Sequence, residues 1–126
     1  MKKTKVFISS VQNEFSEERK MLFEYIYTDA LLGKFFEPFI FENLPAKDVR
    51  SDVAYLVQVK QGDIYIGIFG KEYGSQNKKG FSPTEQEYDL ACKENKTRLI
   101  FISNSTVDRN PKELKLIRKA ENYVIR

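Results

Sequence analysis

The chain has 126 residues, enough for about one domain with a single core, and its 21 basic and 18 acidic residues leave a formal net charge of +3. Such a balanced charge is typical of a soluble surface and argues against direct nucleic-acid binding, which requires a basic patch. The sequence has no histidine and one cysteine, Cys92, which excludes Ser-His-Asp and Cys-His catalysis, an intrachain disulfide and an ordinary zinc site.

The amino-terminal residues are basic, but only three apolar residues, 6–8, follow them before two serines. This apolar run is too short for a signal peptide or a membrane span. A single cysteine is also compatible with a reducing compartment. We therefore expect a cytoplasmic protein that makes no membrane contact.

Apolar runs alternate with helical periodicity along the chain. In chain order, the sequence predicts a strand at 6–8, a helix at 13–32, a strand at 35–41, a helix at 49–61, a strand at 63–70, a helix at 83–95, a strand at 98–102, a helix at 111–120 and a strand at 123–125. Gly33 and Gly62 are expected to end the first two helices. Pro38 predicts an edge position for the second strand, because proline cannot donate a ladder hydrogen bond. The near-continuous apolar run at 63–70 is typical of a central parallel strand.

This alternation predicts an α/β fold. We expect a three-layer, flavodoxin-like or Rossmann-like domain, with a parallel sheet of about five strands in the order 2-1-3-4-5 and helices on both faces. Residues 1–126 are expected to form one such domain. Because the helix that normally closes this fold would follow a fifth strand, we also expect the chain to be the N-terminal part of a longer protein.

In this strand order, ligands bind where the carboxyl ends of strands one and three meet. Ser9 and Ser10 end the first strand, and the polar loop 70–80 follows the third. The two serines can hold phosphate or ribose hydroxyls, or they can simply cap a helix. Gly70 and Gly74 can shape the loop for a ligand, or they can only permit its turns.

Further along this loop, Tyr73 can cover a base or ribose ring, or it can form a lid on local apolar surface. Ser82, Pro83 and Glu85 form a capping box, in which the serine oxygen accepts from the amide three residues on and Glu85 reaches back. Capping is therefore the favoured role of Glu85. Ser82 is also a candidate ligand contact.

Glu87 lies one turn before Ala91, so helical spacing turns its carboxylate towards the sheet. A carboxylate on that face must find a cation, a hydrogen-bond donor or a ligand, because leaving it unpaired costs several kcal/mol. A structural ion pair and a functional role are equally open for Glu87.

Arg19 shares its helical stripe with Phe15 and Leu22, which draws the guanidinium inward. We hypothesise that Arg19 pairs with an inward acid, Glu87 or Asp63, and either braces the site or binds an anionic ligand group. The alternative is an aliphatic stem along the core with the charged head in water.

Two standard nucleotide-binding signatures are missing. No glycine-rich fingerprint follows the first strand, and the loop at 70–74 lacks the Gly-Lys-Ser/Thr ending of a phosphate loop. Ordinary Rossmann dehydrogenases and P-loop NTPases are therefore disfavoured. The sequence predicts no cofactor and no metal.

Several segments together carry a family resemblance: Val6–Ser10, Glu18–Arg19, Gly70 with Tyr73–Gly74, Ser82–Tyr88 with Ala91, Asp108–Lys112 and Ala120–Arg126. This combination resembles a bacterial domain-of-unknown-function family, over nearly the whole chain. That family is usually found at the amino end of larger proteins, including STAND-type NTPases and transcriptional regulators with an AlbA-like domain.

The resembled family is itself similar to TIR domains and to nucleoside 2-deoxyribosyltransferases. In those transferases, a glutamate in a Glu-x-Gly-x-Ala context attacks the anomeric carbon of the sugar. Residues 87–91 read Glu-Tyr-Asp-Leu-Ala, so the resemblance implies that Glu87 is the nucleophile, with Asp89 in place of the glycine. It also implies supporting roles for Arg19 and Ser10 and a position over the base for Tyr73.

Two functions follow as hypotheses. The first is a non-catalytic regulatory or sensing module of a bacterial signalling, defence or transcription-regulatory protein, which binds a protein partner or a nucleotide-like ligand and controls an attached effector domain. Homo-oligomerisation is left open. The second is an N-glycosidase or deoxyribosyltransferase that acts on NAD or nucleosides through Glu87. Direct DNA binding is disfavoured by the balanced charge.

Overall fold

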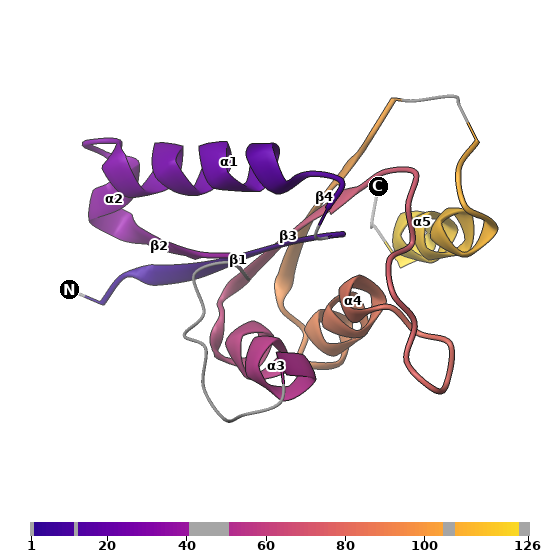
Figure 1. Ribbon diagram of the computed structural model, residues 1–126. Helices are drawn as coiled ribbons and strands as arrows, with labels where there is room; N and C mark the ends of the chain where they lie inside the picture. The colour runs from indigo at the N-terminus through magenta and orange to yellow at the C-terminus, as the bar shows by residue number, and fades with distance from the viewer. Residues whose placement is uncertain (1, 12, 41–50, 105–107, 124–126) are drawn as a thin grey trace.

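The structure is a computed structural model, and it describes residues 2–11, 13–40, 51–104 and 108–123. Within these ranges the strands are β1 (Thr4–Ser10), β2 (Phe36–Phe39), β3 (Ile64–Phe69) and β4 (Thr97–Ile102). The helices of the same ranges are α1 (Ser16–Thr28), α2 (Leu32–Phe35), α3 (Ser51–Gln61), α4 (Pro83–Lys93) and α5 (Pro111–Tyr123) (Figure 1). Among these helices, none combines the length and the hydropathy that crossing a bilayer requires.

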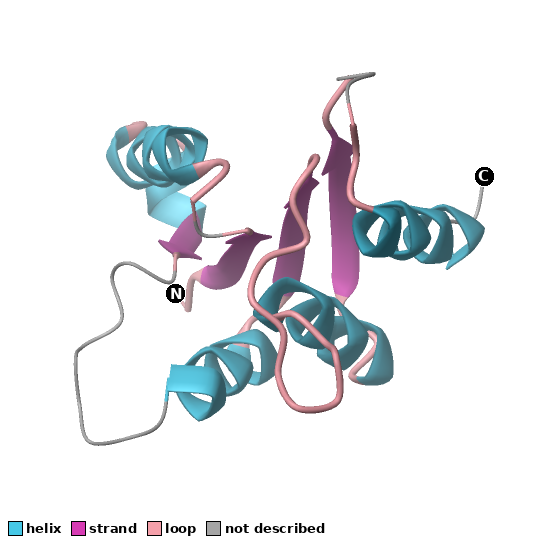
Figure 2. Ribbon diagram, turned by 45° about the vertical axis from the view of Figure 1, so that its right-hand side comes forward, coloured by secondary structure: helices cyan, strands magenta, loops and turns pink. Residues whose placement is uncertain are grey.

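The strands form a parallel sheet in the order β2-β1-β3-β4. Helices α1 and α2 lie on one face of this sheet, and α3 and α4 lie on the other (Figures 1 and 2). Alternation along β1 produces the two cores, because Val6 and Ile8 pack with Ile26 of α1, whereas Phe7 packs with Val59 of α3. The predicted α/β class, with a parallel sheet and helices on both faces, is therefore confirmed.

Two of the strand positions follow from the features that predicted them. Strand β3 lies between β1 and β4, as its continuous apolar run indicates. Strand β2 lies at an edge and contains Pro38, and an edge strand tolerates a proline because one of its sides makes no ladder hydrogen bonds. The end of α3 is also as expected, because the Gly62 amide donates to the carbonyl oxygen of Gln58 at 2.9 Å.

The predicted fifth strand is wrong at its first residue, because Tyr123 is the last residue of α5, and residues 124–126 lie outside the described ranges. Three residues are too few to distinguish a strand from the continuation of a helix. Strand β4 is consequently an edge of the described sheet. The second strand ends at Phe39, and the predicted position Phe41 lies outside the described residues.

The first helix is shorter than predicted, because it ends at Thr28. The Asp29 carboxylate accepts hydrogen bonds from the amides of Leu31 and Leu32, both at 2.9 Å, and so starts α2. Gly33 lies inside α2 and does not end α1. A Cβ at Gly33 would lie 2.5 Å from the Tyr27 carbonyl oxygen, so the glycine allows α2 to turn back closely against α1.

Candidate functional site

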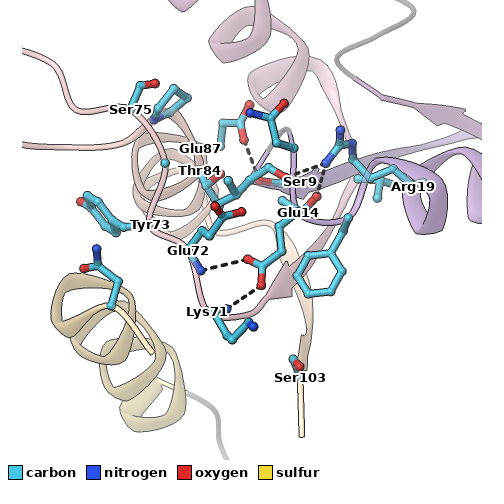
Figure 3. Close-up of a pocket in the computed structure, with 18 of the residues that line it drawn as sticks. Ser9, Glu14, Arg19, Lys71, Glu72, Tyr73, Ser75, Thr84, Glu87 and Ser103 are labelled. Carbon is cyan, nitrogen blue, oxygen red and sulfur yellow. Dashed lines mark hydrogen bonds between the residues drawn. The ribbon is translucent and has the colours of Figure 1, made fainter. Parts of the chain in front are cut away.

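An open cavity of about 1260 Å³ lies at the carboxyl ends of β1 and β3, where the strand order reverses. Its walls come from the end of β1, the segment leading into α1, the loop after β3, the start of α4 and the residues after β4 (Figure 3). The structure thus brings the two predicted loops together around one space. Of the predicted site residues, Ser9, Ser10, Arg19, Tyr73, Gly74 and Glu87 line it.

Glu87 lines this cavity with only 5% of its surface exposed. Its Oε1 accepts a hydrogen bond of 2.6 Å from the Ser9 hydroxyl (Figure 3). Burial raises the pKa of Glu87 to about 8, and this exceeds the opposite effects of the Ser9 hydrogen bond and of the Arg19 charge. The Glu87 carboxyl is therefore mostly protonated at neutral pH.

Arg19 is buried, with 1% exposure, although it carries a full charge. Its guanidinium donates to the Ser10 hydroxyl and, at 2.9 Å, to the carbonyl oxygen of Val11. The alternative in which its head reaches water is therefore wrong. Asp63 is also not its partner, because the Asp63 carboxylate accepts from the Lys5 amide at 2.8 Å at the amino end of β3, away from the cavity. Arg19 instead acts through its charge on Glu87, whose pKa it lowers.

Ser9 and Ser10 belong to β1 and do not follow it. Successive strand residues point to opposite faces, so Ser9 faces α4 and meets Glu87, whereas Ser10 faces α1 and meets Arg19. Neither serine caps α1, whose N-cap is Phe15 without a side-chain hydrogen bond. The two hydroxyls therefore bind Glu87 and Arg19, one each.

Two predicted glycines have specific conformational roles. A Cβ at Gly70 would lie 2.5 Å from a carboxylate oxygen of Glu14 and 2.6 Å from the Phe15 ring, so the segment before α1 passes against bare backbone. Gly74 has a φ of +89°, in the left-handed region that favours glycine. Gly74 therefore has the predicted alternative role of permitting a turn, whereas Gly70 makes room for the Glu14 and Phe15 side chains.

Tyr73 is buried, with 2% exposure, and does not stand free over the cavity. Its hydroxyl donates to the Glu85 carboxylate and accepts from the Ser82 amide at 3.3 Å. The Lys112 ammonium lies 5.6 Å from the centre of its ring. Tyr73 therefore ties the β3–α4 loop to the start of α4 through its hydroxyl.

The capping box at the start of α4 is only half formed. The Ser82 hydroxyl accepts from the Glu85 amide at 3.1 Å, as predicted. The Glu85 side chain, however, does not reach back, because Tyr73 binds the Ser82 amide in its place. Glu85 pairs with Lys119 of α5 instead. Its role is therefore to hold α4, α5 and the loop together.

Replacing Tyr73 with phenylalanine is expected to lower the free energy of unfolding by about 1 to 2 kcal/mol, because the Ser82 amide and the Glu85 carboxylate each lose a buried partner. Urea denaturation followed by circular dichroism measures this loss. The control is Tyr25→Phe, since Tyr25 is 61% exposed on α1 and its hydroxyl should contribute within about 0.5 kcal/mol. Equal stability of the two variants would contradict the tie.

Sequence reasoning missed three polar groups, of which Glu14 lines the cavity and Glu113 and Tyr65 are buried. The Glu14 carboxylate accepts from the amides of Lys71 and Glu72, at 2.7 Å and 3.0 Å. Glu113 of α5 is fully buried and accepts from the Gly70 amide at 3.1 Å. The Tyr65 hydroxyl and the Glu113 Oε1 have no hydrogen-bond partner among the described residues. The only sequence signal was the Pro-x-Glu pattern at 111–113, which places an acid in the first turn of a helix.

Burial raises the pKa of Glu113 to about 7, and the neighbouring Glu14 charge adds to the shift, against the Gly70 hydrogen bond and the Arg109 charge. The described part of the chain contains no His, Cys, Asp and Glu cluster that could hold a metal ion. The site thus offers one neutral carboxyl with a hydroxyl beside it, a buried guanidinium and a pair of loop amides. These groups suit a polar organic ligand better than a metal.

Comparison with known families gives one match. A model described as "Domain of unknown function (DUF4062)" matches residues 5–124, which is nearly the whole chain. No curated protein matches the sequence.

Proposed function

Because the chain belongs to the DUF4062 family, whose function is unknown, we propose a role from the cavity: the domain is a regulatory or sensing module that binds a small nucleotide-like ligand. The parent protein in this proposal is a bacterial signalling, defence or transcription-regulatory protein, such as a STAND-type NTPase or an AlbA-type regulator. Ligand occupancy controls an effector domain attached to the module. The family match agrees with the resemblance at the level of a domain of unknown function.

The observation that carries this proposal is the position of Glu87, which lines the cavity beside the Ser9 hydroxyl and whose pKa burial raises to about 8. A protonated carboxyl that lines a cavity can donate a hydrogen bond to a carbonyl, a ring nitrogen or a sugar oxygen, all of which nucleosides carry. The same group is a poor nucleophile while it holds its proton. Ligand recognition therefore uses the protonated carboxyl of Glu87, whereas turnover needs the ionised carboxylate.

An exposed apolar surface supports the proposed contact with an attached domain. Leu99 and Phe101 of β4 are 46% and 58% exposed. Their register partners, Ile66 and Ile68, belong to the face that α1 covers over β1. Over β4 this face is left without a helix in the described part of the chain (Figure 1). We place the effector contact on this surface, since covering it removes apolar side chains from water.

A second function is favoured by the access to Glu87. Its carboxyl lines the open cavity, with the Arg19 charge favouring the ionised form. An N-glycosidase or deoxyribosyltransferase acting on NAD or nucleosides would use ionised Glu87 to form a bond to the anomeric carbon. The base would leave with the electrons of the glycosidic bond. Such activity would rise as the pH passes through about 8, where Glu87 loses its proton.

One experiment separates the two functions. Wild type and Glu87→Gln are incubated with NAD and a nucleoside panel, with binding measured by calorimetry and base release by chromatography. Because glutamine matches the shape of a neutral glutamic acid, both proteins are expected to bind the same ligand within about threefold, and neither should release base. The control is Glu24→Gln, which removes an exposed carboxylate of α1.

Base release by wild type that is abolished in Glu87→Gln would establish the glycosidase instead. Binding by neither protein to any member of the panel would reject a nucleotide-like ligand for this cavity. Binding by wild type and Glu24→Gln with a large loss in Glu87→Gln would show that the ionised carboxylate makes the contact.

A further inference from the structure

The loop after β3 holds a carboxylate on its backbone. The amides of Lys71 and Glu72 donate to the two oxygens of Glu14, Oε2 and Oε1, at 2.7 Å and 3.0 Å (Figure 3). The preceding amide, that of Gly70, donates to Glu113. Two consecutive amides of this loop therefore converge on one carboxylate, as in a backbone anion site, whereas the Gly70 amide binds a second carboxylate.

The occupant of this site comes from a different part of the chain. Glu14 precedes α1 and lies 57 residues from Lys71 in sequence. The Glu14 carboxylate and the Phe15 ring approach the loop so closely that a Cβ at position 70 would lie 2.5 Å and 2.6 Å from them. Lys71 and Glu72 are exposed and line the same cavity as Glu14, so the two hydrogen bonds lie at the cavity wall.

The amide pair and Glu87 line a single cavity. Glu87 and Ser9 offer a neutral carboxyl and a hydroxyl, which suit the uncharged part of a ligand. The amides and the Lys71 ammonium suit an anionic part. A ligand that carries both parts, as a nucleotide does, matches the two groups of contacts.

We propose that the Lys71 and Glu72 amides bind a phosphate group of the ligand, and that Glu14 occupies this site as an internal competitor when no ligand is bound. This inference rests on the proposed function for the remainder of the ligand, but not for the anion. A dissolved carboxylate has the same charge as Glu14 and lacks its high effective concentration. A phosphate displaces Glu14 more readily, because it carries up to about two negative charges.

Displacement of Glu14 also has a structural consequence. The two hydrogen bonds tie the segment before α1 to the β3–α4 loop. Binding of phosphate exchanges this tie for contacts to the ligand. Ligand binding in the cavity therefore changes the contacts at the amino end of α1, outside the ligand itself.

The test is a titration of wild type, Glu14→Ala and Glu17→Ala with inorganic pyrophosphate, followed by the amide signals of Lys71 and Glu72 in nitrogen-15 NMR. Removing the competitor is expected to tighten pyrophosphate binding by about tenfold in Glu14→Ala relative to wild type. Glu17→Ala removes the same charge from an exposed position in α1 and should bind as wild type does. A parallel titration with acetate is expected to show much weaker binding in all three proteins.

A second variant, Glu14→Gln, guards against loss of the fold, because its amide oxygen can keep one of the two hydrogen bonds, and an intermediate gain in affinity is expected. The proposal is overturned if both Glu14 variants bind pyrophosphate no more tightly than Glu17→Ala, or if the signals that shift lie away from residues 71 and 72. It is also overturned if acetate binds as well as pyrophosphate. Neither readout depends on Glu87, so a failed nucleoside panel and a failed pyrophosphate titration are distinguishable.

Discussion

Glu87→Gln is expected to abolish most of the loss of stability that the wild-type domain shows between pH 5 and pH 8. The folded-state pKa of Glu87 is raised from 4.5 to about 8 by burial, so the folded protein binds the proton more tightly than the unfolded chain. The resulting stabilisation is fully present below the unfolded pKa and is lost as the pH rises through the folded pKa. For this shift, linkage predicts a loss on the order of 3 kcal/mol across that interval.

Glutamine has the shape of the protonated side chain and does not titrate, so the variant lacks this loss. Burial also raises the pKa of Glu113 to about 7, so Glu113 likewise causes stability to fall as the pH rises. Glu87→Gln is therefore expected to retain a smaller pH dependence of stability. Urea denaturation of wild type, Glu87→Gln and Glu24→Gln at pH 5, 6, 7 and 8 measures the difference. If the profile of Glu87→Gln ran parallel to that of wild type, Glu87 would have to be ionised in the folded protein over the whole range.

Arg19→Met is expected to lower the free energy of unfolding by about 3 kcal/mol at pH 7. Methionine keeps the aliphatic stem but leaves the Val11 carbonyl and the Ser10 hydroxyl without their buried donor. It also removes the charge that lowers the pKa of Glu87, so the midpoint of the pH profile should move upward. The matched control is Arg118→Met on the exposed side of α5, which should change stability by no more than about 0.5 kcal/mol.

Both readouts come from the same urea series. If Arg19→Met were as stable as wild type, the guanidinium would contribute only through its stem. A lower stability with an unchanged pH midpoint would show that Arg19 supports Ser10 and Val11 but does not act on Glu87.

Local patterns predicted most of the framework. The apolar run of β3, the proline of β2 and the Ser-Pro start of α4 each carry their structural meaning within a few residues. The errors occurred where a local pattern has two solutions. Helix α1 ends earlier than predicted, and Asp29 binds the amides at the start of α2. Tyr123 belongs to α5, where a strand was expected.

In the site, helical periodicity was sufficient to turn Arg19 and Glu87 inward, but their partners could not be read from it. The Ser9 hydroxyl that binds Glu87 lies 78 residues away in sequence. The predicted partner Asp63 lies at the amino end of β3, opposite to the cavity, where it accepts from the Lys5 amide. The sequence likewise shows only that Tyr73 is an aromatic residue on a polar loop. The structure adds that its hydroxyl binds Glu85 and Ser82.

The sequence by itself therefore determined the α/β class, the inward orientation of Arg19 and Glu87 and the loops that flank the cavity, because each of these depends on periodicity and on residues close together in the chain. Tertiary structure decided that Glu87 is buried, which raises its pKa, and that Glu14 binds the amides of Lys71 and Glu72. Desolvation and hydrogen-bond pairing depend on groups that are far apart in the sequence and are brought together by the order of the strands, so no local pattern encodes them.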